Sequence, residues 1–246
     1  MGSRRILRPL PLLAIAVILA LLVALGVWQL RRAAQKQEMF NEFTARAQGP
    51  TIQVLTEPLG LEQAWSRAQV TGQYSDHGQF LVDNRLHQGQ PGFYVVTPFR
   101  IDASEVRILV NRGWIPLLRS RTELPEPPVP SDLREISGQL VAPMPAFTLE
   151  RESPVFDAPL RQNLDLAFLA ATAPFPLHDY VLRLDADMPD GFVRQWPVPD
   201  RQRVHRHHAY AAQWFGLALV FVGVVTALVR RERRSIGRVS RRHKID

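Results

Sequence analysis

The sequence predicts an α+β membrane protein in which two transmembrane helices flank one mostly antiparallel, β-rich extracytoplasmic domain with one or two helices. Three observations support this prediction: two apolar segments of membrane length lie near the ends of the 246-residue chain, short β-rich stretches fill the region between them, and basic residues cluster outside both segments. The mean hydropathy of -0.10 conceals this uneven distribution, because it averages two membrane-like segments with a polar middle.

The first apolar segment covers residues 9–30 and contains no charged side chain. A helix needs roughly 20 residues to cross a hydrocarbon core of about 30 Å, so this segment is long enough to span a bilayer. Good helix formers continue after Leu30 as far as Gly49 and Pro50, which predicts that the helix runs on beyond the membrane. A cleaved signal peptide is the alternative, with a cut near Ala24 and Gly26, although the apolar stretch exceeds the usual length of roughly 7–15 residues.

The region between the spans is predicted to be mostly antiparallel β, because apolar stretches of strand length alternate with turn residues. Residues 162–172 have a helical composition with Asn163 or Asp165 near the start, and the proline-rich residues 124–130 read as a surface connection. No internal repeat and no heptad pattern is evident. The predicted strands are AQVTGQY (68–74), QFLVDNR (79–85), GFYVVTPFRI (92–101), VRILVNRGWIPL (106–117), REISGQLV (134–141) and DYVLRLD (179–185).

The second span covers residues 209–229, and the tail at 230–246 holds eight basic and two acidic residues. Residues 1–8 carry three more arginines, and basic flanks mark the cytoplasmic side of a membrane. Both termini are therefore expected in the cytoplasm, and residues 31–208 in the periplasm of a bacterium, with both spans in the inner membrane. The absence of an arginine- and serine-rich transit peptide favours a bacterial over a mitochondrial origin.

Composition argues against several function classes. The net charge of +7 and the pI near 10.6 come from the two ends, while the middle is nearly neutral, so nucleic-acid binding is not expected. The chain has no cysteine, which excludes disulfides, thiolate metal sites and cysteine nucleophiles. It also lacks a G-x-S-x-G elbow, a phosphate-binding loop and an H-E-x-x-H pair. A non-enzymatic protein is therefore predicted, and an exported hydrolase is the weakest alternative.

A histidine cluster precedes the second span, with His205, His207 and His208 a turn or two before the apolar run. If the helix already includes residue 207, then His207, Tyr210 and Trp214 lie three and four residues apart on one face. An imidazole at the edge of an apolar region suits axial ligation of haem iron, and aromatic side chains pack on a porphyrin. Two alternatives stay open: a simple interfacial belt of aromatic residues and histidines, and zinc or copper bound by the three histidines, whose adjacent positions diverge by roughly 100° on a helix.

Small residues on the opposite side of the second span suggest how the spans pack. Small side chains at such spacing let membrane helices approach closely. We expect the small-residue faces of the two spans to meet, which would turn the face with His207 outward toward lipid or a partner. These faces are Ala16, Ala20 and Ala24 in the first span, and Ala212, Gly216, Gly223 and Ala227 in the second.

Six motifs occur in an order that resembles the surfeit locus protein one family, membrane factors that assist assembly of haem-copper cytochrome oxidase. The resemblance implies a bacterial member that supports insertion of haem a into the catalytic subunit of cytochrome c oxidase, with haem a synthase as a further partner. The motifs are GVWQLRRAAQK (26–36), VTGQY (70–74), LVDNR (81–85), QPGFYVVTPF (90–99), VNRGWIP (110–116) and HHAYAAQWFGLA (207–218).

The resemblance also implies roles for single residues. His207 falls on the family histidine implicated in haem a binding, and Tyr210 and Trp214 fall on its aromatic positions. Family members often have asparagine and leucine where this chain has Arg206 and His208, which leaves His208 open as an alternative ligand. The first motif is matched by Gly26, Trp28, Gln29, Arg32 and Lys36.

Two interpretations compete within this resemblance. In the first, His207 holds haem a transiently; in the second, the protein is a membrane-tethered docking scaffold that binds no haem. Arg112 and Trp114 of the VNRGWIP motif are read mainly as fold determinants, with contact to an oxidase subunit or a haem propionate as the alternative.

Overall fold

The computed structural model describes residues 9–54, 56–118, 123–143, 155–199 and 201–242, with the backbone alone at residues 9, 61, 202–203, 233 and 235–242. The chain divides into two compact units, a helical unit from residues Met1–Asn41 and Pro199–Asp246 and a β unit from Glu42–Val198. The arginines expected to mark the cytoplasmic side at residues 1–8 lie outside the described residues, as do the last four residues of the basic tail.

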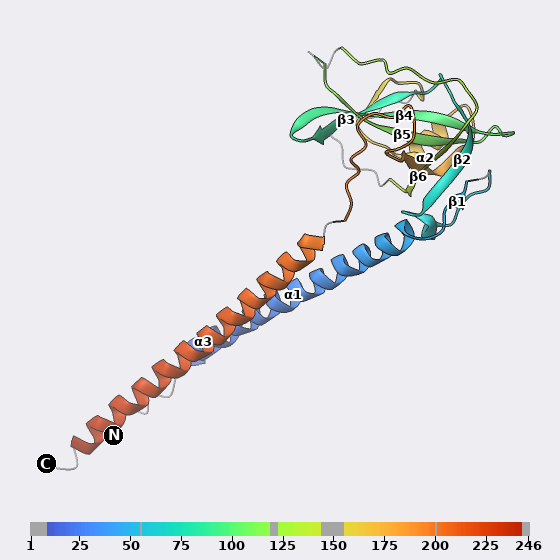
Figure 1. Cartoon of the computed structure of the whole chain (residues 1–246). Helices are drawn as coiled ribbons and strands as arrows, with labels where there is room; N and C mark the ends of the chain where they lie inside the picture. Colours follow the sequence, from blue (N-terminus) through green and yellow to red (C-terminus); the bar gives the residue numbers. More distant parts are fainter. Residues whose placement is uncertain (1–8, 55, 119–122, 144–154, 200, 243–246) are drawn as a thin grey trace. The chain divides into compact units, whose positions relative to one another are not determined.

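The helical unit consists of two long helices, α1 (Pro9–Ala47) and α3 (Arg201–Arg242), which run alongside each other in Figure 1. Both are long and apolar enough to cross a membrane. Large apolar side chains point away from the protein along both helices, for example Leu10 at 77% exposure and Leu219 at 75%. Such a surface is costly in water and stable in lipid. The helical continuation past Leu30 is confirmed, and α3 begins early enough to include His207, which meets the condition set for a common face with Tyr210 and Trp214.

The two helices bury small residues at seven-residue intervals. Gly26 and Ala33 are the buried positions of α1, and Val204, Ala211 and Ala218 are those of α3, among the side chains that the structure describes in these helices. A Cβ at Gly26 would lie 2.7 Å from the ring of Phe215, so a larger residue here would require the ring to move. The repeat escaped notice in the sequence because its members are mostly glycine and alanine rather than large apolar residues.

The predicted helix faces were therefore wrong. Ala16, Ala20 and Ala24 are exposed on α1. On α3, Ala212 and Ala227 are exposed, and an added Cβ at Gly216 or Gly223 would meet no atom within 4 Å. The face of α3 that carries His207 was expected to turn outward. It instead includes the buried Ala211 and Ala218 and turns toward α1. Each helix offers more than one stripe of small residues, and periodicity alone does not choose between them.

This arrangement predicts the outcome of cysteine cross-linking, for which the chain provides a background free of native cysteines. Gly26→Cys combined with Phe215→Cys should be joined efficiently by a short thiol-reactive reagent, since these positions pack together. Ala20→Cys combined with Gly216→Cys should be joined poorly, because both positions face away from the partner helix. Gel mobility in native membranes gives the readout, and equal yields for the two pairs would contradict the packing.

The β unit is built on one mixed sheet of eight strands in the order β1-β2-β6-β8-β5-β4-β3-β7. All six predicted strands form, and the mostly antiparallel character is confirmed. Two short strands were not predicted, and three pairings are parallel: β1 with β2, β3 with β7, and β5 with β8. The strands are β1 (Ile52–Gln53), β2 (Arg67–Tyr74), β3 (Phe80–His87), β4 (Gln90–Ile101), β5 (Arg107–Pro116), β6 (Arg134–Val141), β7 (Leu160–Arg161) and β8 (Leu177–Leu184).

An additional pairing of β2 with β4 closes β2, β6, β8, β5 and β4 into a ring. Gly72 makes this closure possible, because it lies opposite Ile101 and a Cβ there would stand 2.0 Å from the carbonyl oxygen of Arg100. The ring encloses the main core, and a second core lies under α2 (Leu166–Thr172), whose Leu169 is buried. Asp165 caps α2 by accepting a hydrogen bond from the backbone N–H of Phe168, as its position near the predicted helix start suggested. A 3₁₀ turn (Leu61–Gln63) precedes β2.

Candidate functional site

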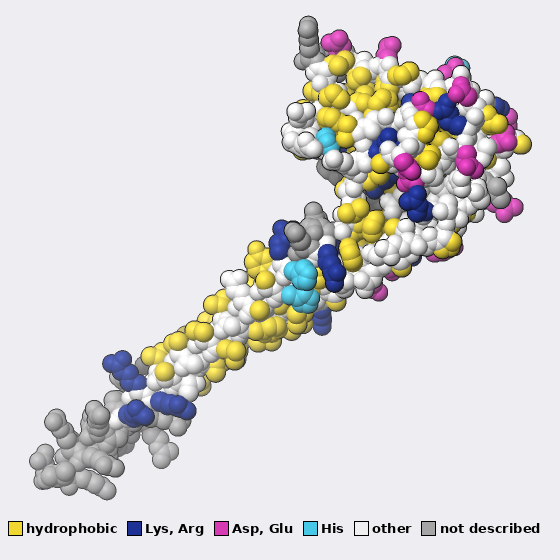
Figure 2. All heavy atoms as spheres, in the orientation of Figure 1, with side chains coloured by type: hydrophobic (Ala, Val, Ile, Leu, Met, Phe, Trp, Pro, Cys, Tyr) yellow, Lys and Arg dark blue, Asp and Glu magenta, His cyan; other side chains and the backbone are white. Residues whose placement is uncertain are grey.

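The predicted site residues lie within α3, at the level where Figure 2 shows histidine side chains (cyan) between basic residues (dark blue) and a long hydrophobic stretch (yellow). His207 and Trp214 are half-buried, while His208 is exposed and Tyr210 is 53% exposed. The predicted common face of His207, Tyr210 and Trp214 is thus divided: His207 and Trp214 lie on the side of α3 that meets α1, and Tyr210 lies outside it.

The His207 side chain makes a direct hydrogen bond to the other helix. Its Nδ1 lies 2.8 Å from Oε1 of Gln29 on α1. An amide oxygen only accepts hydrogen bonds, so Nδ1 carries the proton and donates it to Gln29. In neutral imidazole the proton then occupies Nδ1 alone, and Nε2 keeps a free lone pair. Among the described residues, no hydrogen bond to His207 Nε2 is found.

The histidine cluster does not assemble a multidentate metal site. No group of three histidine, aspartate or glutamate side chains is placed to share a metal ion, among the residues that the structure describes. His205 and His208 are exposed, whereas His207 is turned toward Gln29. Zinc or copper binding by all three histidines is therefore unsupported, and what remains is one oriented imidazole with an available Nε2.

Arg112 is a structural residue of the β unit and not a contact for a partner. Its side chain is only 1% exposed. The guanidinium donates hydrogen bonds to the carbonyl oxygens of Asp190 and Pro128, each at 2.9 Å, and to Oε1 of Gln79 at 3.2 Å. It also lies 5.1 Å from the ring centroid of Tyr74, a cation–π distance. Arg112 thus connects the ring of strands to the proline-rich segment at residues 124–130. The alternative, in which Arg112 contacts a haem propionate, is wrong because the guanidinium is buried.

Trp114 is likewise part of the fold. It is 6% exposed, and its indole N–H donates to the carbonyl oxygen of Arg85 at 2.8 Å. The neighbouring Gly113 has a φ of 121°, a conformation that disfavours any other residue, and it occurs where β4 and β5 shift register. The VNRGWIP motif therefore encodes a β-bulge with a buried arginine and tryptophan on its two sides.

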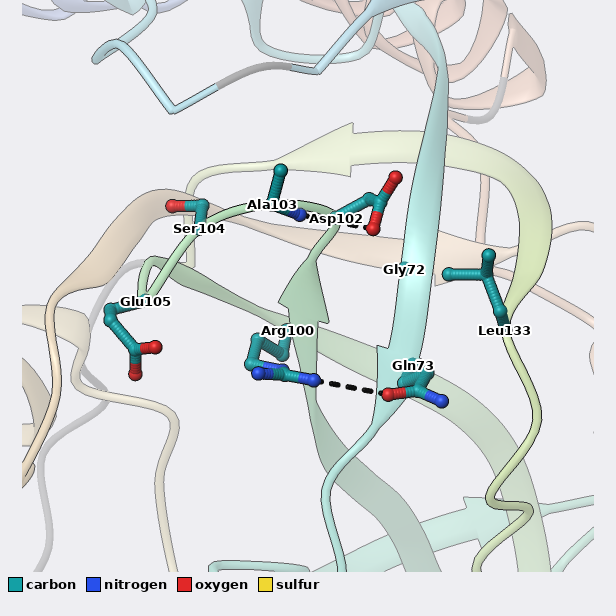
Figure 3. Close-up of a pocket in the computed structure, with 8 residues that line it drawn as sticks. All are labelled: Gly72, Gln73, Arg100, Asp102, Ala103, Ser104, Glu105 and Leu133. Atoms are coloured by element: carbon teal, nitrogen blue, oxygen red, sulfur yellow. Dashed lines mark hydrogen bonds between the residues drawn. The ribbon is translucent and has the colours of Figure 1, made fainter.

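A surface pocket of about 400 Å³ opens in the β unit where β2 meets the turn between β4 and β5 (Figure 3). Arg100 crosses its floor and donates a hydrogen bond to Gln73 at 3.1 Å. The hydroxyl of Ser104 accepts a hydrogen bond from the backbone N–H of Val106, and no imidazole among the described lining residues is paired with it. The lining residues are Gly72, Gln73, Arg100, Asp102, Ala103, Ser104, Glu105 and Leu133.

Sequence reasoning placed Gln29 within a motif but gave it no function. Gln29 lies near the C-terminal end of the apolar segment at residues 9–30. Its side chain carries no charge, and it belongs to no catalytic or metal-binding motif. Its contribution depends on the pairing of α1 with α3, which the sequence did not predict correctly. A polar side chain inside an otherwise apolar span was the one available signal, because such groups seek a hydrogen-bonding partner in a membrane.

Comparison with known proteins places the chain in a family. A model of the SURF1 family matches residues 16–219. A SURF1-like protein of Rickettsia felis is 26% identical over 234 residues, which cover 91% of this chain and 98% of the relative. Surfeit locus protein 1 of Xenopus tropicalis is 26% identical over 215 residues, covering 79% of this chain and 67% of the relative. The mouse protein of the same name is 26% identical over 221 residues, covering 78% and 67%. Because the family match extends from the first apolar helix into the second, this chain belongs to the SURF1 family.

Proposed function

We propose that this protein is a non-enzymatic assembly factor for haem-copper cytochrome c oxidase, and that it holds haem a during insertion into the catalytic subunit. The observation that carries the proposal is the half-buried imidazole of His207, with Nδ1 occupied by Gln29 and Nε2 free, at the start of an apolar helix. Family membership and the two apolar helices support the same function.

The residues present fit a haem group. Imidazole nitrogen is a common axial ligand of haem iron, and its second nitrogen usually donates to an oxygen that fixes the ring. Exposed apolar side chains lie about three to four turns further along α3, Leu217 at 45% and Val220 at 64%, and provide a surface that lipid or the apolar part of the haem can cover. A single protein ligand suits transient holding, since release requires only one iron–nitrogen bond to break. His207 is the proposed ligand and His208 the alternative. Trp214 on the same side of α3 and Tyr210 on the neighbouring side are the proposed aromatic contacts of the porphyrin.

The proposed location is the bacterial inner membrane, with both termini in the cytoplasm and the β unit in the periplasm. Arg230, Arg231 and Arg234 lie exposed at the C-terminal end of the apolar part of α3, which supports a cytoplasmic position for that end. The bilayer is thus a partner along both spans. The proposed protein partners are the oxidase catalytic subunit and haem a synthase.

The test is an absorption spectrum of the purified protein after coexpression with the haem a synthesis enzymes. Wild type and His208→Ala should carry a Soret band, and His207→Ala should lose most of it. His208→Ala is the matched control, because it removes a neighbouring imidazole that is exposed and not bonded to Gln29. A full Soret band in His207→Ala would contradict His207 as the ligand, and loss only in His208→Ala would transfer the role to that residue.

A docking scaffold without haem is the second candidate. The β unit exposes large apolar side chains, including Leu86 at 72%, Leu133 at 58% and Val155 at 59%, which suit contact with another protein. In this case all three samples would be colourless, while the catalytic subunit would still copurify with each of them.

A further inference from the structure

The hydrogen bond between His207 and Gln29 connects the two apolar helices at the proposed haem site. The 2.8 Å distance from Nδ1 to Oε1 is that of a normal N–H···O hydrogen bond. On α1 this hydrogen bond lies between the packed positions Gly26 and Ala33. On α3 it is flanked by the buried Val204 and Ala211. Both side chains are half-buried between these packed positions, so the hydrogen bond orients the amide and the imidazole toward each other.

The atoms involved determine which nitrogen of His207 is available. The neutral histidine side chain in water carries its proton mainly on Nε2, and that proton would have to move before Nε2 could bind iron. The acceptor Oε1 holds the proton on Nδ1 and leaves the Nε2 lone pair free. The hydrogen bond also fixes the ring orientation, because it ties the side chain to a residue of the neighbouring helix. Both effects prepare a ligand before any iron is present.

We propose that Gln29 is a positioning residue for the haem site: its amide oxygen selects the Nδ1–H tautomer of His207 and presents Nε2 as the axial ligand. The inference rests on the proposed haem function, and it adds that the site requires both apolar helices. Haem affinity then depends on the pairing of α1 with α3, so a change that separates the helices weakens binding without touching the ligand.

A purely structural role for Gln29 makes a different prediction. Polar groups often hydrogen-bond between membrane helices simply to hold them together. In that case loss of the amide would loosen the helix pair and release the tautomer, but the affinity for haem would stay unchanged wherever the helices remain paired. The two roles are therefore distinguished by haem affinity at unchanged helix pairing, and the tautomer shows whether the hydrogen bond is present.

The first experiment measures the tautomer in the full-length protein without haem. Nitrogen NMR of 15N-histidine-labelled protein in detergent at pH 8 separates protonated from unprotonated ring nitrogens, and the His207→Ala spectrum identifies the His207 signals. Wild type should show a protonated Nδ1 at His207. Gln29→Leu should shift the proton to Nε2, whereas Gln29→Glu, which keeps an acceptor oxygen at the same length, should retain it on Nδ1. Leu30→Met is the control for an exposed neighbouring position and should resemble wild type.

The second experiment titrates the same proteins with haem a and follows the Soret band. Partners of a metal-binding histidine typically contribute 10–100-fold in affinity, so Gln29→Leu should raise the Kd at least about tenfold. Gln29→Glu and Leu30→Met should stay within about threefold of wild type, and the cross-linking yield of the Gly26 and Phe215 cysteine pair should confirm that the helices remain together.

The outcomes separate the inference from the function on which it rests. An Nε2–H tautomer in wild type, or an unchanged tautomer or affinity in Gln29→Leu, would overturn the role of Gln29 while leaving haem binding intact. Failure of wild type to bind haem a at all would overturn the proposed function, and the NMR result would still decide whether Gln29 sets the tautomer.

Discussion

Replacing Arg112 by methionine is expected to lower the free energy of unfolding of the β unit by about 3 kcal/mol. The variant leaves the carbonyl oxygens of Asp190 and Pro128 and the amide oxygen of Gln79 without the donor that now reaches them. Hydrogen bonds from a charged group contribute about 1.5–3 kcal/mol, and relief of the buried guanidinium offsets part of their loss. Chemical denaturation of detergent-solubilised protein, followed by tryptophan fluorescence, measures the effect.

Arg100→Met is the matched control for this experiment. Arg100 comes from the adjacent strand β4 and makes one hydrogen bond, to Gln73, but its side chain is exposed. Solvent can replace that interaction, so the change in unfolding free energy should stay within about 0.5 kcal/mol. Equal destabilisation by the two variants would contradict a special role for the buried position. Unchanged stability of Arg112→Met would show that the proline-rich connection does not depend on Arg112.

Stability of the β unit is expected to fall as the pH decreases from 7.5 to 5.5, because of His178. This residue is 4% exposed on β8, and neither ring nitrogen has a hydrogen-bonding partner among the described residues. Burial lowers the pKa of His178 from its ordinary value of 6.5, against the smaller opposing effects of the Asp179 carboxylate and of the nearby backbone of Glu57. The unfolded chain therefore binds a proton at a higher pH than the folded chain, and acidification below about 6.5 favours unfolding, with a slope of at most about 1.4 kcal/mol per pH unit.

Leucine at this position should remove the His178 contribution to the pH dependence. His178→Leu replaces an unsatisfied buried imidazole with an apolar side chain, so stability at pH 7.5 should be unchanged or higher. His77→Leu is the control, since the His77 side chain is 83% exposed and should leave the pH dependence as in wild type. Denaturant titrations at several pH values measure both variants. The same slope in His178→Leu and wild type would assign the acid sensitivity to other groups.

The secondary structure of the β unit followed from local patterns. The stretches 68–74 and 134–141 alternate apolar and polar residues, and in β2 and β6 these positions alternate between buried and more exposed environments. Asp165 was recognised near the start of α2 because a short acidic side chain caps a helix through its own local hydrogen bond. Such features depend on residues close in sequence, so no knowledge of the rest of the fold was needed.

Only part of the candidate site could be predicted from the sequence. The position of His207 in a helix near an apolar run was predicted from spacing and is confirmed. Its direction was predicted wrongly, because both sides of α3 carry small residues and the choice depends on α1. Gln29 and Phe215 decide it: the first hydrogen-bonds His207, and the second packs its ring against Gly26.

By itself, the sequence determined the two apolar helices, the strands between them and the absence of cysteine chemistry. These properties depend on composition and on periods of two or 3.6 residues along a single segment. Only the tertiary structure decided the parallel pairing of β5 with β8, the closure of the ring at Gly72, the burial of Arg112 and the face of α3 that meets α1. Each of these depends on which distant backbone comes within hydrogen-bonding or van der Waals distance, and that choice is made by the packing of the whole unit and not by any one segment.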